Sequence, residues 1–577
     1  MRLTSSLHTF AAAALAASLF GSLAPLAGCQ LVAGLGGEEP LAGGSGGAGG
    51  GGGGGATTTG GTTATGGGGA GGGGAGGGSA CNEGDEQPCY TGPDGTLNVG
   101  LCKGGSRTCG ANGEFGPCEG EVTPAAEVCS TAADESCDGA NCGDVIWARQ
   151  LTGASFVNVA FDLASGELIT VGSFQGKIGE GANELTSAGG RDAFIVKWSS
   201  FGEILWARSF GDTATQSFGA VTVGTAGNIY VGFTNLGTLV ADSFTTTSVT
   251  GVIKFDPQGT ASWLTETGGE GGGALVKAGI GAIRLATDGD VLAHARFLGT
   301  MQIGPETFMK SDQDGVVMKL NGATGAPLWA FQYGTSTSDG AGSISPAPAG
   351  GVYLTGTVDG AVNVPGGQIV SGMSATDTDG FVARFGAGGA MLWGQAFGSA
   401  QGFQAGRKLA SDLDGNVVVA GSFDGQFAFS GGGSNLVADA DYALFAAKLD
   451  QGGTHLWSGA IDGPGTLSPF NPSALAGGPG HVVAVGELEG SLTFGDTTLT
   501  SDGSADGFVA KIDGATGATI WARKIGGAAY QVVDSVSVDA SGRVAIGGEF
   551  EGAIVLGDDS FVTPGGTVDP FIAVLAP

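Results

Sequence analysis

Charged side chains are scarce in this sequence, and positively charged ones are especially scarce. Asp, Glu, Lys and Arg make up 13% of 577 residues, and 54 acidic residues against 22 Lys and Arg give a net charge of -32. A nucleic-acid-binding surface needs Lys and Arg to neutralise phosphates, so this balance argues against nucleic acid as a partner. Because the acidic residues are scattered, we interpret the negative charge as favouring the solubility of an exported protein.

Histidine and long apolar runs are also scarce. Of the four histidines, His294, His455 and His481 are spread over the C-terminal region, and no cluster of His, Cys and carboxylates has the spacing of a metal site. No catalytic constellation is apparent, so we expect a protein that is not an enzyme. The apolar run from Phe10 to Phe20 is too short to span a membrane.

Glycine, by contrast, is abundant, with 119 residues, and 41% of the chain is hydrophobic. Many glycines, few charges and a substantial apolar content are typical of an all-β protein with many tight turns.

The N-terminal residues 1–28 have the pattern of an export signal. A positive start at Arg2 is followed by the short apolar run, and then by Leu26-Ala27-Gly28-Cys29. These four residues resemble the lipobox of bacterial lipoproteins. The resemblance implies that Cys29 is acylated, becomes the mature N-terminus and anchors the protein to a membrane, with Gln30 favouring the outer membrane. The alternative is an ordinary signal peptide with an incidental cysteine.

Residues 29–80 are predicted to be a tether between the lipidated cysteine and the folded part of the chain. Residues 42–80 consist almost entirely of Gly, Ala, Thr and Ser, which cannot bury apolar surface. Such a segment is a flexible coil with a reach on the order of 35 Å.

Residues 81–142 contain all the cysteines other than Cys29 and are predicted to be a small disulfide-stapled module. Eight cysteines allow 105 pairings, and the sequence does not choose among them. The Cys-Tyr-Thr-Gly-Pro and Gly-Pro-Cys stretches resemble Cys-rich modules of bacterial surface proteins. The predicted disulfide cysteines are Cys81, Cys89, Cys102, Cys109, Cys118, Cys129, Cys137 and Cys142.

The end of this module, residues 129–139, resembles a short Cys/Asp motif associated with metal binding. Its carboxylates are Asp134, Glu135 and Asp138. Clustered carboxylate oxygens suit a hard cation such as calcium, so these residues are the candidate calcium ligands. The alternative is a solvated acidic loop, since alanines occupy positions where the motif commonly has acids.

Residues 143–577 are organised by a tryptophan that recurs at intervals of 57 to 66 residues, usually with a glycine four positions before it. A period of this size is the signature of a repeat architecture. Each repeat contains four strand-like pieces joined by Gly-containing turns, which predicts a four-stranded antiparallel sheet. The recurring tryptophans are Trp147, Trp206, Trp263, Trp329, Trp393, Trp457 and Trp521.

This pattern resembles the seven-bladed β-propeller repeat family of bacterial exported proteins, the SBBP type. The resemblance covers residues 143–577 and implies seven four-stranded blades around a central channel. The region starts with a Trp strand, Val145 to Leu151, and ends after the third strand of the last repeat, Phe571 to Leu575. We therefore predict that the first strand closes the ring as the outer strand of the last blade, which leaves no free edge. The tryptophans are predicted to pack between blades.

The best candidate ligand surface is the mouth formed by the connections from each Trp strand to the next inner strand. Aromatic residues there could stack on sugar rings or on the side chains of a partner protein. The alternative, favoured on the residues alone, is that these rings fill gaps between blades. The mouth candidates are Phe156, Phe218, Phe403, Arg407, Phe470 and Tyr530.

Three functions remain open. The leading hypothesis is a surface-tethered lipoprotein that acts as a non-catalytic binding, adhesion or scaffolding module, located at the bacterial outer membrane or cell surface, with a glycan or protein ligand. The second is a glycan lyase or hydrolase with carboxylates at the channel mouth. The third is a structural envelope component. Propellers host many activities, so the fold does not choose among them.

Overall fold

The computed structural model describes residues 81–577 apart from short gaps. The gaps are residues 94, 126–128, 130–133, 136, 138–140, 180, 269–270, 273–274, 277, 335–341, 372–377, 400–401, 430–434, 439–441 and 463–471. The predicted signal peptide, the lipidation site Cys29 and the tether lie outside the described residues, as do Phe470 and Asp138. Over the part of the chain that the structure describes, no helix is long and apolar enough to cross a membrane.

The described chain forms two compact units, and the smaller one is held together by disulfides. It contains β1 (Glu86–Cys89) and β2 (Gly105–Thr108), which pair antiparallel. Its three disulfides are Cys81–Cys109, Cys89–Cys118 and Cys102–Cys137. Among its described residues, the buried apolar side chains are all cysteines. The disulfides therefore take the place of a hydrophobic core, as is common in small secreted domains.

A fourth disulfide, Cys129–Cys142, lies in the larger unit, which includes Cys129–Ala132 and Ala140–Pro577. All eight cysteines that were predicted to form disulfides are thus paired, which confirms the prediction. Four disulfides indicate an exported or extracellular protein, because reducing compartments do not preserve such bonds.

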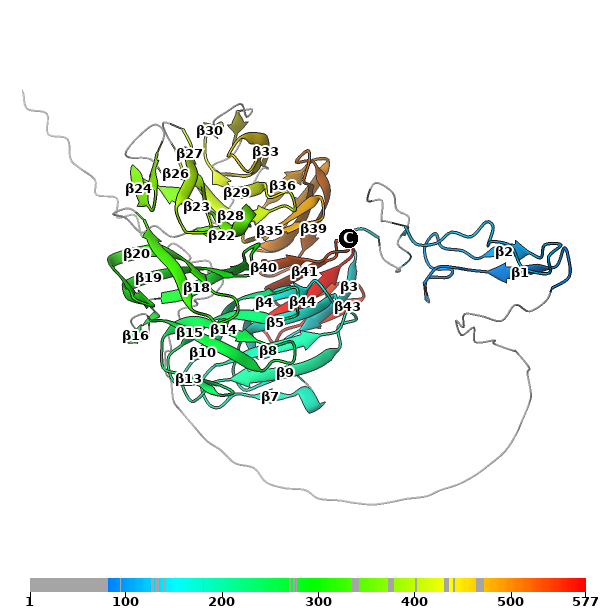
Figure 1. Cartoon of the computed structure of the whole chain (residues 1–577), viewed down its shortest axis with the longest axis horizontal. Coiled ribbons are helices and arrows are strands. Elements are labelled where there is room, and N and C mark those ends of the chain that lie inside the picture. Colours follow the sequence, from blue (N-terminus) through cyan, green and yellow to red (C-terminus); the bar gives the residue numbers. More distant parts are fainter. Residues whose placement is uncertain are drawn as a thin grey trace, which may run out of the picture. The chain divides into compact units, whose positions relative to one another are not determined.

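The larger unit is a β-propeller of seven four-stranded antiparallel blades (Figure 1). This confirms the predicted fold class. From the channel outward, blade one contains β4 (Ala154–Asp162), β5 (Glu167–Phe174), β8 (Asp192–Trp198) and β9 (Ile204–Phe210), and blade two contains β10 (Gln216–Val223), β11 (Ile229–Asn235), β14 (Thr250–Phe255) and β15 (Ala261–Gly268). Blade three contains β18 (Ala278–Leu285), β19 (Val291–Ile303), β20 (Glu306–Leu320) and β21 (Pro327–Tyr333). Blade four contains β22 (Ser343–Ala347), β23 (Gly351–Val358), β26 (Asp379–Phe385) and β27 (Met391–Phe397).

The remaining blades follow the same order, except that the outer strand of the last blade comes from the start of the region. Blade five contains β28 (Gln404–Ser411), β29 (Val417–Phe423), β32 (Ala443–Leu449) and β33 (His455–Ile461). Blade six contains β34 (Ala474–Gly478), β35 (His481–Leu488), β38 (Asp506–Asp513) and β39 (Thr519–Ile525). Blade seven contains β40 (Gln531–Val538), β41 (Val544–Glu551), β44 (Val568–Leu575) and β3 (Val145–Gln150).

Short hairpins decorate the connections between the second and third strands of the blades. In blade three, β19 and β20 are themselves long enough to form this extension. The separate hairpins are β6 (Lys177–Ile178) with β7 (Leu185–Thr186), β12 (Leu239–Ala241) with β13 (Phe244–Thr246), β24 (Ala361–Val364) with β25 (Gly367–Val370), β30 (Gln426–Phe427) with β31 (Leu436–Val437), β36 (Ser491–Phe494) with β37 (Thr497–Thr500), and β42 (Ala553–Leu556) with β43 (Asp559–Val562). A further pair, β16 (Gly271–Gly272) with β17 (Leu275–Val276), precedes β18, and 3-10 turns occur at η1 (Gly181–Asn183) and η2 (Pro348–Gly350).

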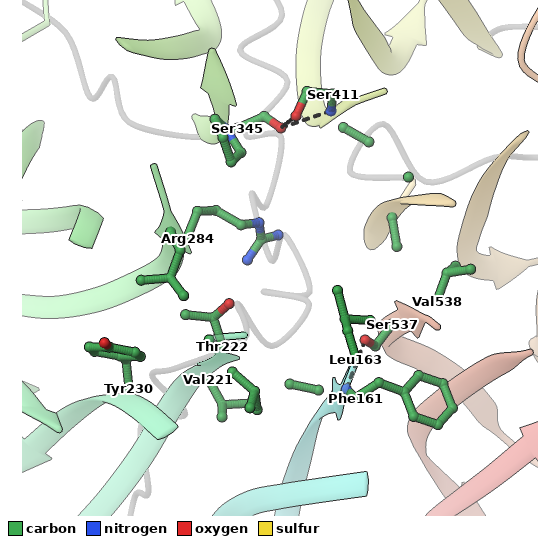
Figure 2. Close-up of a pocket in the computed structure, with 18 of the residues that line it drawn as sticks. Phe161, Leu163, Val221, Thr222, Tyr230, Arg284, Ser345, Ser411, Ser537 and Val538 are labelled. Carbon is green, nitrogen blue, oxygen red and sulfur yellow. Dashed lines mark hydrogen bonds between the residues drawn. The ribbon is translucent and has the colours of Figure 1, made fainter. Parts of the chain in front are cut away.

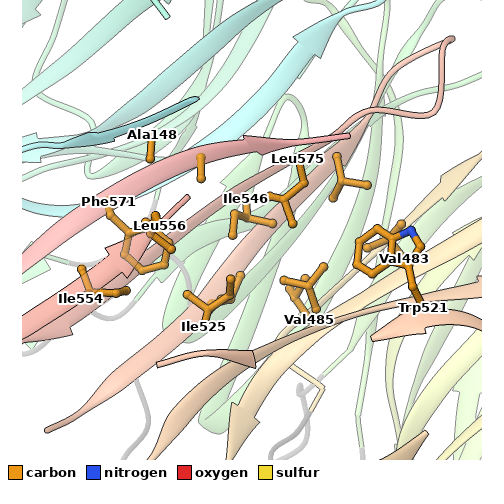
Figure 3. Packing of buried hydrophobic residues seen from close by; sticks show 14 of the residues in the cluster. Ala148, Val483, Val485, Trp521, Ile525, Ile546, Ile554, Leu556, Phe571 and Leu575 are labelled. Atoms are coloured by element: carbon orange, nitrogen blue, oxygen red, sulfur yellow. The ribbon is translucent and has the colours of Figure 1, made fainter. Parts of the chain in front are cut away.

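Strand β3 closes the ring, as predicted from the phase of the repeat. It pairs antiparallel with β44 from Val145 opposite Leu575 to Gln150 opposite Phe571. Figure 3 shows Ala148 of β3 close to Phe571 and Leu575 of β44, in a cluster that also holds Trp521 of the sixth blade. The two ends of the propeller sequence thus share one sheet and one core, so the last blade has four strands like the others and the edge of β44 is covered.

The recurring tryptophans lie between blades. Six of the seven indoles donate their N–H to a main-chain carbonyl in the turn between the third and fourth strands of the next blade. These bonds run from Trp147 to Ser200, Trp206 to Pro257, Trp263 to Gly322, Trp329 to Ala387, Trp393 to Gln451 and Trp457 to Gly514. The same contact repeated around the ring explains why the residue recurs.

The seventh indole lies at the closure, where chain connectivity differs. Gly143 packs against Trp521 there, and a Cβ added to Gly143 would lie 3.1 Å from the indole Cδ2. The nearby carbonyl of Cys142 accepts a hydrogen bond from Arg523 instead, at 2.9 Å. The indole N–H of Trp521 is buried and has no hydrogen-bond partner among the described residues. The closing strand thus reproduces the packing but not the polar contact.

Glycine is required in the turn because of this packing. Gly517 has φ +76°, and a Cβ there would lie 2.7 Å from Cε3 of Trp457. Gly517→Ala is therefore expected to lower the free energy of unfolding by about 2–4 kcal/mol, from backbone strain and overpacking together. Urea unfolding followed by tryptophan fluorescence measures this.

Gly360→Ala is the matched control, since Gly360 has φ +77° but an added Cβ would meet no atom within 4 Å. It is expected to cost about 1 kcal/mol, the price of the backbone conformation alone. Equal losses for the two variants would contradict the role assigned to the indole contact.

Candidate functional site

The inner strands of the blades run in the same direction around the channel. Residues that lie two apart on one inner strand bond to residues two apart, in the same order, on its neighbour. The Val159 N–H donates to Ser535 Oγ and the Phe161 N–H to Ser537 Oγ, both at 3.0 Å. All inner strands therefore begin at one end of the channel, which we call the entry end. They finish in the first hairpins of the blades, at the hairpin end.

Four inner strands carry a β-bulge at the same ladder position near the entry end, and β4 carries one closer to its start. The antiparallel ladder skips Gly219 in β10, Gly281 in β18, Arg407 in β28 and Asp534 in β40. Gly281 is exposed, and a Cβ added to it would meet no atom within 4 Å. The bulge position thus faces open space in the channel, so a long side chain placed there can enter it.

Two of the four bulges carry charges of opposite sign. Arg407 is 7% exposed, and burial lowers its pKa to about 10. The next residue, Lys408, has its pKa lowered to about 8, chiefly by burial, while Asp534 acts in the opposite direction. Burial raises the pKa of Asp534 to about 7, against the effect of Lys408. Two blades thus place a cationic and an acidic wall in the same channel.

A second position carries further charges, on the second strand of each blade. Four blades have a hydroxyl side chain there, and the other three have an ionisable one. In blade order the residues are Ser173, Thr234, Arg296, Thr357, Ser422, Glu487 and Glu549. Since the hydroxyl residues suffice for folding in four blades, the charged exceptions are candidates for a function that the ring symmetry does not require.

Glu549 is the most deeply buried carboxylate of this set, with 6% of its surface exposed. Burial, reinforced by Asp534, raises its pKa to about 8. Burial and Glu489 raise the pKa of Glu487, and burial and Glu487 raise the pKa of the Tyr530 phenol. Blades six and seven therefore form an acidic wall, in which Asp534 and Glu549 hold protons near neutral pH, and blades three and five contribute cations.

The predicted mouth aromatics do not form one continuous ring. Phe218 is fully buried, with its ring centroid 5.4 Å from that of Phe210, so it is a core residue that no ligand can reach. Phe156 and Tyr530 are half-buried. Phe403 is also half-buried, and the Arg407 guanidinium lies 5.4 Å from its ring centroid. The structure thus brings Phe403 and Arg407 together but separates Phe218 from them, because a strand side chain can face either the channel or the next blade.

The three histidines of the propeller are structural. His294 forms a 2.8 Å hydrogen bond with the Tyr333 hydroxyl, and burial lowers its pKa to about 3. Burial also lowers the pKa of His481 to about 4, and His455 stacks on Phe429 with centroids 5.9 Å apart. These imidazoles lie in three different blades and are neutral at physiological pH.

The acidic loops show no metal cage among the residues that the structure describes. No group of three or more His, Cys, Asp or Glu side chains there could hold an ion. The main-chain carbonyls of Asp134 and Glu135 accept hydrogen bonds from Leu101 and Ala125. In the propeller, Asp412 pairs with Lys448 at 2.7 Å and caps its own hairpin turn. With Asp138 outside the described residues, calcium binding stays a prediction.

The hairpin end of the channel contains a cavity of about 600 Å³. The last residues of the inner strands and their first turns line it. Arg284 of β18 extends into it, and the hydroxyls of Thr222, Ser345, Ser411 and Ser537 lie around it (Figure 2). This cavity lies toward the hairpin end from the charged bulges, and Leu409 of its wall directly follows Lys408.

Most of these groups are absent from the sequence-based candidates. Arg284, Lys408 and Asp534 belong to three different blades and have no common motif. One signal was present: the Gly-Glu pairs at Glu487 and Glu549 stand where other blades have Gly-Ser or Gly-Thr. Comparing repeats for their exceptions, rather than for their shared residues, would have found that part of the site.

No family model matches this sequence, so the SBBP assignment stays a prediction. No curated protein matches it either. Among solved structures, the WD40 domain of Neurospora crassa Pan2 is 10% identical with a TM-score of 0.35, over 73% of this chain and 89% of that one. A europium-containing methanol dehydrogenase is 10% identical with a TM-score of 0.36, over 75% and 93%. At these values the similarities carry no argument about function.

Proposed function

We propose that this chain is a surface-tethered lipoprotein that binds a ligand, without catalysis, at the entry end of the propeller channel. The observation that carries the proposal is the pair formed by Phe403 and Arg407. A half-buried aromatic ring lies 5.4 Å from a guanidinium on a bulge that faces the channel. An aromatic face flanked by hydrogen-bonding groups suits a sugar ring, so a glycan is the favoured ligand.

The distribution of charge supports a binding role. Burying an ionisable group costs free energy unless it is paired, and four blades fill the second-strand position with Ser or Thr. The buried Glu549 is therefore unfavourable for folding at its position when it is charged. A ligand with complementary groups would account for its presence.

The location follows from the N-terminal sequence and agrees with the disulfides. Acylation of Cys29 would anchor the protein to the bacterial outer membrane or cell surface. Residues 42–80 would act as a coil that holds the propeller on the order of 35 Å from the membrane, within reach of extracellular or periplasmic ligands.

A glycan lyase or hydrolase is the second candidate, and one observation favours it. The pKa of Asp534 is raised to about 7 and that of Glu549 to about 8, so both can hold a proton near neutral pH. A carboxylic acid with such a pKa can act as a general acid. Both carboxyls also contribute to raising the pKa of the Tyr530 phenol. On this hypothesis, Asp534→Asn would abolish turnover of a bound glycan while leaving its affinity nearly intact.

The test uses the full chain with Cys29→Ser, which removes the lipid and keeps every folded part. Glycan-array screening, followed by calorimetry with the best glycan, is expected to show saturable binding. Phe403→Ala and Arg407→Gln are each expected to weaken it by about tenfold or more. Phe201→Ala is the control, since Phe201 is 79% exposed in a turn at the hairpin end.

Three results separate the hypotheses. Release of new sugar ends from the bound glycan would establish the enzyme instead. Binding of an envelope protein but of no glycan would change the ligand class. A folded protein that binds neither would overturn the proposal and leave a scaffold. If a calcium chelator abolishes binding, the result would support calcium binding by the acidic loops.

A further inference from the structure

The cavity at the hairpin end has the size of a small-molecule site. Its volume of about 600 Å³ lies within the range of roughly 300–1,000 Å³ that is typical of ligand pockets. Inner strands of all seven blades contribute to its wall, namely β4, β10, β18, β22, β28, β34 and β40. It is separate from Phe403 and Arg407, so the inference below does not depend on the proposed function.

Arg284 supplies the cavity with a cation. Its guanidinium points into the space between the inner strands (Figure 2). One hydrogen bond is formed, from Nη1 to the carbonyl of Ile283 at 2.9 Å. No carboxylate lies within ion-pair distance of it among the described residues, whereas Arg208 and Arg543 each pair with an aspartate. A guanidinium carries five N–H donors, so most of them are left for a ligand.

Two serine hydroxyls are also poised to donate. Ser345 Oγ accepts from the Ser411 N–H at 2.8 Å and pairs with Ser411 Oγ at 3.0 Å. When Ser345 donates in that pair, the Ser411 hydroxyl keeps its own proton for another acceptor. Ser537 Oγ accepts from the Phe161 N–H at 3.0 Å, so its proton is available as well. The polar groups of the cavity are thus donors that lie on different sides of Arg284 (Figure 2), which favours a ligand with acceptor oxygens.

The rest of the wall is largely apolar. Phe161, Val221, Leu409 and Val538 contribute to it, and Leu163 lies at its edge with 53% of its surface exposed. Lys408 adds positive charge further along the channel, because Arg284 is among the charges that lower its pKa. One guanidinium, hydroxyl donors and apolar walls suit an anion with a single charge and an apolar body.

We propose that this cavity is a binding site for a small organic monocarboxylate. The carboxylate would accept bidentate hydrogen bonds from Arg284 and a further bond from Ser537, while its carbon skeleton lies against Val221 and Val538. A cation, or an anion without apolar surface, would leave one of these two features unused.

The experiment is calorimetry on the full chain carrying Cys29→Ser, with sodium hexanoate, sodium benzoate and inorganic phosphate as probes at constant ionic strength. Saturable binding of hexanoate or benzoate is expected, with phosphate weaker by about tenfold or more. Arg284→Gln is expected to lower carboxylate affinity by about tenfold or more. Arg149→Gln is the matched control, because Arg149 also donates to the preceding carbonyl, at 2.6 Å, but lies on the outer strand β3.

A pair of variants at Leu163 protects the test against folding defects, since this side chain is exposed at the cavity edge. Leu163→Lys is expected to tighten carboxylate binding and Leu163→Asp to weaken it, each by about threefold, through charge alone. The proposal is overturned if neither carboxylate binds, if phosphate binds as tightly as they do, or if Arg284→Gln and the Leu163 pair all bind like the parent.

Discussion

Removal of residues 1–152 is expected to prevent stable folding of the propeller, because it deletes β3 and opens the ring. Trp147, Ala148 and Leu151 are all buried, and β3 pairs with β44 along its length. Loss of the buried tryptophan and its neighbours would cost about 5 kcal/mol or more. The exposed edge of β44 would also be free to pair with other chains.

The matched control begins at Gly143. It lacks the Cys129–Cys142 disulfide, as the shorter chain does, but it keeps β3. Size-exclusion chromatography and thermal unfolding of the two chains isolate the contribution of the closing strand. We expect a folded monomer from the control and aggregated or unfolded material from the shorter chain. Equal melting temperatures for the two would contradict the closure as a source of stability.

Glu549→Gln is expected to stabilise the protein at alkaline pH and to leave it nearly unchanged at acidic pH. In the folded protein burial raises the pKa of Glu549 from 4.5 to about 8. Between these two values the folded state binds more protons than the unfolded chain, so the free energy of unfolding falls as pH rises through this window. Glutamine resembles the protonated acid and removes this loss, a gain of at most about 5 kcal/mol at about pH 9.

Urea unfolding at about pH 4 and about pH 9 measures the effect. Glu551→Gln is the control on the same strand β41, where the side chain is half-buried. This variant controls for the replacement of a glutamate by glutamine on that strand. A Glu549→Gln variant that is destabilised equally at both pH values would show instead that the carboxylate is charged and paired in the folded protein.

The architecture could be predicted because short stretches of sequence specify each blade and recur in every repeat. Each tryptophan and the glycine four residues before it mark one turn of one blade, and seven copies make the period visible. The phase of that period, with a Trp strand at the start and a third strand at the end, was sufficient to predict the pairing of β3 with β44. The disulfide-rich region was equally clear from the cysteine count, since exported cysteines so close together pair with one another.

Other features depended on contacts between distant parts of the chain. The pairing of Cys81 with Cys109, one of many that the count allows, required the folded loops. Phe218 and Phe403 both lie near the start of an inner strand, yet Phe218 falls within β10 and is in the core, whereas Phe403 precedes β28 and is half-buried beside Arg407. A strand side chain can face the channel or the neighbouring blade, and a bulge of one residue exchanges the two.

The sequence by itself determined the propeller, its closure and the disulfide-rich region, because each of these follows from a pattern that repeats along the chain. Only the tertiary structure decided where binding could occur. Arg284, Lys408 and Asp534 come from three blades, and closure of the ring places them in one channel, where burial and mutual charge set their pKa values. Such a site is formed by residues that differ from their counterparts in the other blades. The charge of each one depends on which residues lie near it in the channel.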